Sequence, residues 1–294
     1  MKSGAVAIIG RPNVGKSTLL NALLGEKIAI VSDKPQTTRS RILGVVHRPD
    51  AEVVLLDTPG IHQARYELNK RMVRAAIETM RDADLLYVMV EATGPARPDD
   101  HTVFRQVQEW KDATNRPTLL LINKVDIVNK TRVLPLIDSY SRLHDWTDIV
   151  PLSALAGDNV ARLMDLTVKY LPEGEAAYGQ DVITDQTMRT LAAELIREKL
   201  LARTREEVPH ALAVEIEDFK EEGKLARISA TVLVEKESQK GIVVGKGGAL
   251  LKAAGTEARI EMERLFGMKV FLQLWVKVRE AWREDERTLA ELGY

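Results

Sequence analysis

Residues 5–18 read AVAIIGRPNVGKST, and this stretch indicates the architecture of the first part of the chain. The apolar run 6–9 stops at Gly10, and residues 15–18 complete the spacing G-x-x-x-x-G-K-[ST], which is typical of a phosphate-binding loop. The two glycines let the backbone turn so that successive N–H groups face phosphate oxygens, and the following helix directs its positive end at the same anion. The stretch therefore predicts a buried strand, a phosphate-binding turn and a helix.

Several residues of this loop have separate predicted tasks. Lys16 reaches the outer phosphates as a point charge, and the Ser17 hydroxyl can bind Mg²⁺. A chance match in a glycine-containing loop is the alternative, and the apolar strand before the loop and the helical pattern after it argue against that alternative. The predicted nucleotide contacts from this loop are Gly10, Arg11, Pro12, Asn13, Val14, Gly15, Lys16, Ser17 and Thr18.

Length and composition set outer limits. The chain has 294 residues, enough for about two domains. Its net charge of −1 gives no indication of a nucleic-acid or membrane partner. It contains no Cys, which excludes disulfides and thiolate metal sites and is compatible with a reducing cytoplasm. We expect neither a signal peptide nor a membrane span, because no apolar run is long enough. The five His residues lack metal-ligand spacing.

The first 170 residues alternate between apolar runs and amphipathic stretches. This alternation predicts an α/β domain with a doubly wound, mostly parallel sheet, whose ligands bind beyond the carboxyl ends of the strands. The expected strands are 6–9, 53–56, 85–90, 118–122 and 149–152, and the expected helices are 16–25, 68–81, 99–114, 130–144 and 158–171.

Three more motifs fall directly after expected strands. An Asp at a strand end can hold Mg²⁺, and a glycine N–H there can contact a terminal phosphate, which is what Asp57 and Gly60 suggest. Asp126 can accept both N–H donors on one edge of guanine, whereas adenine has an acceptor at N1 and is rejected. The predicted contacts are Asp57, Thr58, Pro59, Gly60 and Ile61; Asn123, Lys124, Val125 and Asp126; and Ser153, Ala154 and Leu155, of which a backbone N–H can bind the guanine O6.

Together these motifs resemble the P-loop GTPases. The resemblance implies GTP as substrate, GDP as product, Mg²⁺ as cofactor with Ser17, Asp57 and Thr38 as ligands, and catalytic roles for Lys16, Asn13, Thr38 and Gly60. It also implies a first switch at 32–39, where Thr38 is preferred as the metal ligand and Thr37 stays open, and a second switch at 61–68 with His62, Gln63 and Arg65.

One position departs from many signalling GTPases, which carry a water-orienting Gln directly after the glycine of the second motif. This chain has Ile61 there, which cannot hydrogen-bond water, so we expect slow intrinsic hydrolysis. Asn13 resembles the asparagine by which a translation-associated subset of these enzymes holds K⁺ near the transferred phosphate. The alternative is that Asn13 merely suits the turn geometry of the loop.

Sequence composition changes after residue 170. We expect a GTPase domain over 1–174, a linker over 175–184 with its Pro, Gly and small residues nearby, and a second domain over 185–294. The second domain reads helix, strand, strand, helix, G-x-x-G, helix, strand, followed by a closing helix at 281–289. The two strands 211–217 and 228–234 are expected to pair antiparallel across a short turn.

This order resembles a smaller α+β domain, the type II KH domain, with its signature loop at 242–248. Glycines in such a loop let the backbone approach the sugar-phosphate chain of single-stranded RNA closely. A plain helix-to-helix turn is the alternative. The predicted RNA contacts are Lys236, Lys240, Ile242, Val243, Gly245, Lys246, Gly247, Gly248 and Lys252.

Charge gives a mixed signal in the second domain. From residue 180 onward there are 19 Lys and Arg against 21 Asp and Glu, which counts against nucleic-acid binding in bulk. Between 236 and 252, however, four lysines face one glutamate, and a focal patch suits capture of a single strand. Phe271 and Trp275 can stack bases, although the preferred interpretation is that they cover the closing helix together with Trp282.

Across the whole chain the combination resembles the Era family of GTPases, also through residues 194–201 (ELIREKLL) and 274–279 (LWVKVR). The resemblance implies a cytoplasmic, monomeric GTPase of small (30S) ribosomal subunit assembly that binds the 3′ end of 16S rRNA and associates weakly with the inner membrane; the sequence itself shows no amphipathic anchor. Two alternatives stay open: a metabolic P-loop kinase or ATPase, which Asp126 disfavours, and a signalling GTPase whose second domain binds a protein.

Overall fold

The computed structural model describes residues 1–62 and 66–294. Its contacts divide the chain into two compact units. The first unit holds the described residues of 1–29, 36–65 and 69–185, and the second holds 30–35, 66–68 and 186–294. No helix among the described residues is both long and apolar enough to cross a membrane.

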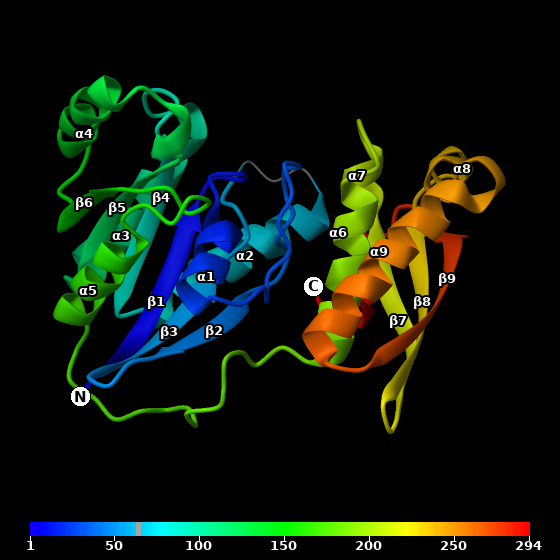
Figure 1. Cartoon of the computed structure of the whole chain (residues 1–294). Helices are drawn as coiled ribbons and strands as arrows, with labels where there is room; N and C mark the ends of the chain where they lie inside the picture. Colours follow the sequence, from blue (N-terminus) through cyan, green and yellow to red (C-terminus); the bar gives the residue numbers. More distant parts are fainter. Residues whose placement is uncertain (63–65) are drawn as a thin grey trace. The chain divides into compact units, whose positions relative to one another are not determined.

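The first unit is built on a six-stranded sheet in the order β2-β3-β1-β4-β5-β6 (Figure 1). All neighbouring pairs are parallel except β2 with β3. The doubly wound, mostly parallel sheet expected from the alternation of elements is therefore confirmed. The strands are β1 (Lys2–Gly10), β2 (Ile42–His47), β3 (Ala51–Asp57), β4 (Leu85–Glu91), β5 (Thr118–Asn123) and β6 (Asp148–Pro151).

Helices cover both faces of this sheet because successive side chains of its strands point to opposite faces and both sets are apolar. Ile8 and Tyr87 face the helices of one side, and Ile9 and Val88 face those of the other. The first side is covered by α1 (Lys16–Leu24) and α5 (Val160–Tyr170). The second is covered by α2 (Glu67–Asp82), α3 (Pro98–Thr114) and α4 (Val133–Ser141), the last preceded by single 3₁₀ turns at Val125–Ile127 and Lys130–Arg132.

The edge strand β2 was not expected from the sequence. It pairs antiparallel with β3, with His47 opposite Glu52, through a tight turn in which the Arg48 N–H donates to the Ala51 carbonyl at 2.8 Å. The signal for this hairpin was present: the apolar run 42–46 is separated from the next strand by a Pro-Asp turn pair.

The expected linker lies along the outer edge of β2, as the segment leaving α5 shows in Figure 1. The Val45 N–H donates to the Ile183 carbonyl at 2.8 Å, and the Thr184 hydroxyl donates to the Leu43 carbonyl at 2.7 Å. Farther back, the buried carboxylate of Glu52 accepts the backbone N–H groups of residues 177 and 178, at 2.6 and 3.3 Å. This segment therefore satisfies a sheet edge whose backbone groups would otherwise be open.

The second unit contains a three-stranded sheet, β7-β8-β9. β7 (Ala213–Glu222) and β8 (Leu225–Val234) pair antiparallel, as expected, and β9 (Lys269–Val278) pairs parallel with β8. The helices are α6 (Met188–Leu201), the short α7 (Val208–Ala211), α8 (Glu237–Val244) and α9 (Ala249–Phe266), with a 3₁₀ turn at Lys246–Gly248 between the last two. Apolar side chains of α6 and α9 form the core with one face of the sheet. The order of helices and strands matches the α+β order expected for this half.

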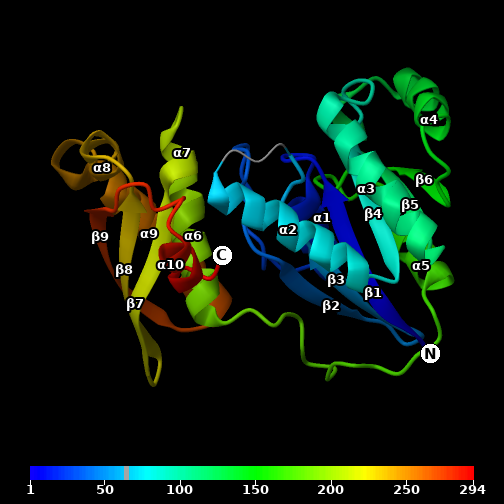
Figure 2. The same ribbon diagram turned by 180° about the vertical axis from the view of Figure 1, so that it is seen from behind.

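The closing helix is shorter than expected. It is α10 (Glu286–Glu291) rather than 281–289, because the Asp285 side chain caps it by accepting the Thr288 N–H at 3.1 Å. In Figure 2 it lies beside α6. Trp282 is buried and donates its indole N–H to the Ala211 carbonyl at 2.9 Å, whereas Phe271 and Trp275 are each 45 % exposed. Almost half of each of these two side chains therefore remains accessible.

Glu52 provides a test of how firmly the 173–184 segment is held. Glu52→Gln replaces one acceptor oxygen with an N–H donor that faces a backbone N–H, so the free energy of unfolding should fall by about 1–3 kcal/mol in urea titrations. Asp50→Asn is the matched control, because it changes an exposed carboxylate of the same hairpin and should cost less than about 0.5 kcal/mol. Equal effects of the two substitutions would contradict the role given to Glu52.

Candidate nucleotide and RNA sites

The phosphate loop joins β1 to α1 at the carboxyl end of the sheet. Gly15 has a φ of +103°, and a Cβ there would lie 2.3 Å from the Asn123 amide nitrogen. That amide donates to the Val14 carbonyl at 2.8 Å, while its oxygen accepts the Ala154 N–H at 2.9 Å. Asn123 thus joins three loops that are far apart in sequence, and Gly15 is required because only a residue without a side chain leaves room for it.

Lys16 is buried at the start of α1. Its ammonium donates to the carbonyl oxygens of Gly10 at 3.3 Å and Arg11 at 3.1 Å. Burial lowers the pKa of Lys16 to about 8, although the Asp57 carboxylate partly opposes that shift. The positive charge of Lys16 is therefore only partly compensated within the loop, and a phosphate group would complete the compensation.

Three predicted metal ligands come together next to it. The Ser17 hydroxyl donates to the Asp57 Oδ2 at 2.6 Å and lies 2.7 Å from the Thr38 hydroxyl, which is itself 3.5 Å from the same carboxylate oxygen. Burial raises the pKa of Asp57 to about 6, against the opposing effect of Lys16. The other carboxylate oxygen, Oδ1, is buried and has no hydrogen-bond partner among residues 1–62 and 66–294.

The segment after Asp57 approaches the phosphate loop closely. A Cβ on Gly60 would lie 2.6 Å from the Pro12 nitrogen, and the buried Thr58 hydroxyl donates to the Ile8 carbonyl at 2.8 Å. Ile61 is buried in the core under α2, so its side chain does not face the loop. Pro59 lies between Thr58 and Gly60 in the same buried turn.

His62 connects the two predicted switches. Its Nδ1 donates to the Gly60 carbonyl at 2.8 Å, so the opposite nitrogen, Nε2, accepts from the Gln36 amide at 3.0 Å. The remainder of the predicted second switch includes Gln63 and Arg65, which lie outside the described residues.

The predicted base-reading residues lie at the ends of β5 and β6. Asp126 is exposed, as a group that reads an incoming base must be. Lys124 has a φ of +69° and donates to the Asn13 carbonyl at 2.9 Å, while Val125 packs against the core. The base loop is thus attached directly to the phosphate loop.

The third predicted base-contacting segment follows β6. The Ser153 N–H is taken by the Asp158 carbonyl at 3.1 Å, and the Ala154 N–H by Asn123. Within the described parts of the chain, the Leu155 N–H is the one of these three donors without a partner. It is therefore the donor available to a guanine O6.

Sequence reasoning missed Glu91, the last residue of β4. Its carboxylate accepts from Arg11 of the phosphate loop and from Lys124 of the base loop. The signal was the same as for the predicted motifs, namely a charged residue directly after a buried apolar strand.

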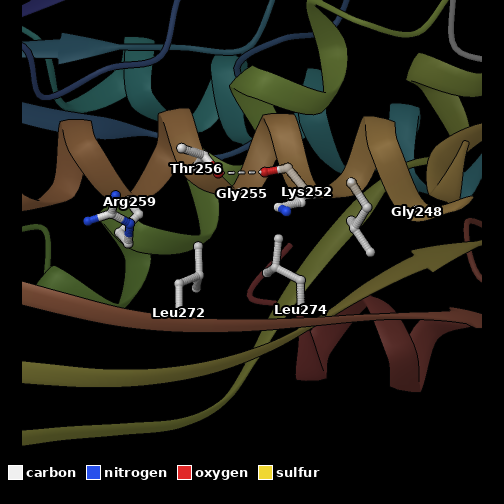
Figure 3. Close-up of a pocket in the computed structure, with 8 residues that line it drawn as sticks. Gly248, Lys252, Gly255, Thr256, Arg259, Leu272 and Leu274 are labelled. Carbon is white, nitrogen blue, oxygen red and sulfur yellow. Dashed lines mark hydrogen bonds between the residues drawn. The ribbon is translucent and has the colours of Figure 1, made fainter.

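The second unit carries a groove between α9 and β9 with a volume of about 330 Å³ (Figure 3). Gly248, Lys252 and Arg259 come from the helix side, and Leu272 and Leu274 come from the strand side. Gly255 and Thr256 lie between them on the helix, and the Thr256 hydroxyl donates to the Lys252 carbonyl at 2.8 Å. The groove therefore has an apolar strand wall and a cationic helix rim.

The glycine-rich loop forms one end of this groove. Gly245, Gly247 and Gly248 have φ values of +72°, +59° and +81°, and nothing lies within 4 Å of a Cβ placed on the last two. Their backbone is thus open to a close approach by a ligand. The predicted contacts that are exposed are Lys236, Ile242, Lys246, Gly247 and Lys252, and those that are half-buried are Lys240, Gly245 and Gly248.

Val243 differs from its expected role. It is fully buried in the core of the second unit, so it packs α8 against that core and does not face the groove. Its neighbour Ile242 is exposed because consecutive helical residues point about 100° apart.

Two family comparisons match the two units. Residues 5–124 match the family described as 50S ribosome-binding GTPase, and residues 207–283 match the KH domain family. The chain is 49 % identical to the GTPase Era of Syntrophus aciditrophicus over 100 % of this chain and 95 % of that one. It is 51 % identical to the GTPase Era of Geobacter metallireducens over 100 % of this chain and 98 % of that one. The chain belongs to the Era family of GTPases.

Solved structures of that family agree over the full length. A crystal structure of Era in complex with MgGDPNP and nucleotides 1506–1542 of 16S ribosomal RNA is 44 % identical, with a TM-score of 0.95 and coverage of 100 % of this chain and 99 % of that one. A single-residue variant of Aquifex aeolicus Era bound to GDP·AlF₄⁻ is 43 % identical, with the same TM-score and coverage. The expected GTPase and KH architecture is thereby confirmed, and the kinase and ATPase alternative is not supported.

The pKa of Lys16 yields a pH prediction for nucleotide binding. Burial lowers the pKa of Lys16 to about 8, and only its ammonium form can compensate phosphate charge, so the affinity for GDP without Mg²⁺ should fall as the pH rises above about 8, by up to about tenfold per unit. The Kd of GDP is measured by calorimetry from pH 7 to 9.5. Guanosine is the control, because it has the same base and no phosphate. A constant ratio of the two Kd values across this range would contradict the prediction.

Proposed function

We propose that the chain is a Mg²⁺-dependent GTP-hydrolysing switch that binds 16S rRNA near its 3′ end during assembly of the small ribosomal subunit in the cytoplasm. The observation that carries the nucleotide half is the cluster of Ser17, Thr38 and Asp57 beside the buried ammonium of Lys16. The solved relatives that contain MgGDPNP or GDP·AlF₄⁻ support the same assignment.

The residues present suit Mg²⁺. The cluster supplies two hydroxyl oxygens and a carboxylate, the hard oxygen ligands that this ion prefers, and the buried Asp57 Oδ1 still requires a cationic or hydrogen-bonding partner. When bound, Mg²⁺ neutralises charge on the β- and γ-phosphates. Thr38 belongs to the first switch, so a ligand that holds this hydroxyl also fixes that segment.

The loops on either side of the metal cluster have complementary tasks. Lys16 compensates the charge of the outer phosphates, and the Gly60 N–H binds a terminal phosphate oxygen, a role that the close approach of Gly60 to the phosphate loop supports. Asp126 accepts the two N–H donors of guanine, and the Leu155 N–H binds its O6. These contacts select GTP over ATP because adenine would oppose an acceptor to the Asp126 carboxylate.

Hydrolysis requires a substitute for the missing water-orienting Gln, since Ile61 is buried in the core. We assign part of the lost rate enhancement to K⁺ held by Asn13, which would stabilise charge between the β- and γ-phosphates. The φ of +64° at Asn13 accounts for an asparagine on backbone grounds alone, so the two explanations need separate variants.

The RNA half of the proposal rests on the groove of the second unit. Its open glycine backbone suits sugar-phosphate, its lysines suit phosphate charge, and its apolar wall suits the faces of unpaired bases. The relative crystallised with nucleotides 1506–1542 of 16S ribosomal RNA supports this partner. A signalling GTPase whose second domain binds a protein is not favoured, because that structure and the KH match both indicate RNA.

The RNA assignment is tested by reversing charge in the loop. The double variant Lys246→Asp with Gly247→Asp should weaken binding of a single-stranded RNA with the sequence of nucleotides 1506–1542 by about tenfold or more, because carboxylates repel the phosphates. The readout is fluorescence anisotropy at fixed salt.

A matched control exists in the turn between β7 and β8. Lys224→Asp with Gly223→Asp makes the same change at another glycine of positive φ with nothing within 4 Å of its Cβ. This control should bind RNA within about twofold of the unchanged chain. Equal RNA affinities of the two double variants would overturn the groove as the RNA site.

The K⁺ assignment predicts faster GTP turnover in KCl than in NaCl at equal ionic strength, by about tenfold. Asn13→Gly should abolish the difference, because glycine keeps the positive φ of the loop and the carbonyl that accepts from Lys124, and removes only the side chain. Phosphate release is measured for both chains in both salts. Equal rates in the two salts for the unchanged chain would remove K⁺ from the mechanism.

A further inference from the structure

Glu91 lies at the end of a central strand, between the phosphate loop and the base loop. It ends β4, and its side chain is only 10 % exposed although it carries a carboxylate. One carboxylate oxygen accepts from the Arg11 guanidinium and the other from the Lys124 ammonium. The Arg97 guanidinium, next to the start of α3, lies 3.3 Å away. A carboxylate this enclosed needs such partners to remain ionised.

Each of the two principal partners belongs to a loop with its own task. Arg11 follows the first glycine of the phosphate loop, and its Nε lies 3.3 Å from Asp100 in the first turn of α3. Lys124 comes two residues before Asp126 and also donates to the Asn13 carbonyl at 2.9 Å. Glu91 therefore connects the loop that holds phosphate to the loop that reads the base.

The charges make Glu91 hard to replace. Burial disfavours the ionised carboxylate, but the hydrogen bonds and charges of Lys124 and Arg11 outweigh burial and hold its pKa below the ordinary value. If the carboxylate were removed, the two cations would face one another without a shared anion. Lys124 depends more on Glu91 than Arg11 does, because the Lys124 side chain is partly exposed whereas the Arg11 side chain is more enclosed and also lies beside Asp100.

We propose that Glu91 is a positioning residue for guanine recognition. It holds Lys124 against the phosphate loop and thereby fixes the backbone from which the Asp126 carboxylate reaches the base. The inference rests on the base-reading role proposed above for Asp126, and it adds the residue that fixes the geometry of that role.

Loss of the Glu91 carboxylate should therefore weaken the discrimination between bases, and this effect can be measured separately from any loss of stability. ITP differs from GTP only in lacking the exocyclic amine that one Asp126 oxygen accepts. The Kd of ITP divided by the Kd of GTP therefore measures this contact, and any fraction of unfolded chain affects both Kd values alike. For a charged hydrogen bond the ratio should be on the order of ten or more in the unchanged chain.

The experiment compares this ratio in the full chain and three variants. Glu91→Gln keeps the shape of the side chain and removes its charge. Asp84→Asn is the matched control at the opposite end of β4, where the carboxylate accepts the Ala5 N–H at 2.9 Å and lies 3.6 Å from Arg116. Asp126→Asn removes the base-reading carboxylate itself. The Kd values are measured with non-hydrolysable analogues of GTP and ITP, and the melting temperature is recorded for each variant.

We expect Glu91→Gln to reduce the ratio at least about threefold, and Asp84→Asn to leave it unchanged even where it lowers the melting temperature. Asp126→Asn should bring the ratio close to one. If Glu91→Gln keeps the full ratio while Asp126→Asn loses it, the positioning role of Glu91 is overturned and the base-reading role stands. If the unchanged chain shows no preference for GTP over ITP, the base-reading role fails first and the inference fails with it.

Discussion

The Asn123 side chain is the contact on which the nucleotide site depends. One amide accepts the Ala154 N–H and donates to the Val14 carbonyl, so the ends of β1, β5 and β6 are held in one place. These residues are distant in sequence and meet only because parallel strands bring their carboxyl ends to one edge. Gly15 is a consequence of the same contact, since any side chain there would collide with the amide. The conformation of the phosphate-binding loop thus depends on the hydrogen bonds of Asn123 as well as on the phosphate.

Around that contact the groups of the site are held by one another. Lys16 is enclosed by loop carbonyls, and Ser17, Thr38 and Asp57 share hydrogen bonds. Groups that their neighbours fix lose little conformational entropy on binding, which favours both affinity and catalysis. This arrangement lowers the stability of the folded chain, because burial disfavours the charged forms of both groups: it shifts the pKa of Lys16 downward and that of Asp57 upward.

The sequence located a motif at the edge of the sheet wherever that motif lay directly after a buried strand. The phosphate loop and the Asp57 and Asp126 motifs each do so, and strand ends are easy to locate from apolar runs. Sequence reasoning missed β2, although the apolar run 42–46 and the Pro-Asp turn before the next strand signal that hairpin. It also assigned Val243 and Ile242 the same role, because the sequence does not show which side of α8 packs against the core.

Contacts between distant side chains were the other limit. Nothing in the local sequence shows that Glu91 meets both Arg11 and Lys124, because the carboxylate, the guanidinium and the ammonium come from three separate loops. The Asp285 cap that shortens the closing helix is a local signal by contrast, and the start of α10 could have been placed from it.

The segment along β2 changes where the first folded unit ends. Residues up to 184 supply hydrogen bonds to the sheet edge, and Tyr178 and Val182 pack on Leu43 and Val45. A shortened chain that stops at 174, where the composition changes, would leave an open strand edge beside an apolar patch, a combination that promotes self-association. A chain that stops after 185 keeps both covered. The stretch that looks like a spacer in the sequence thus serves as the outermost layer of a folded domain.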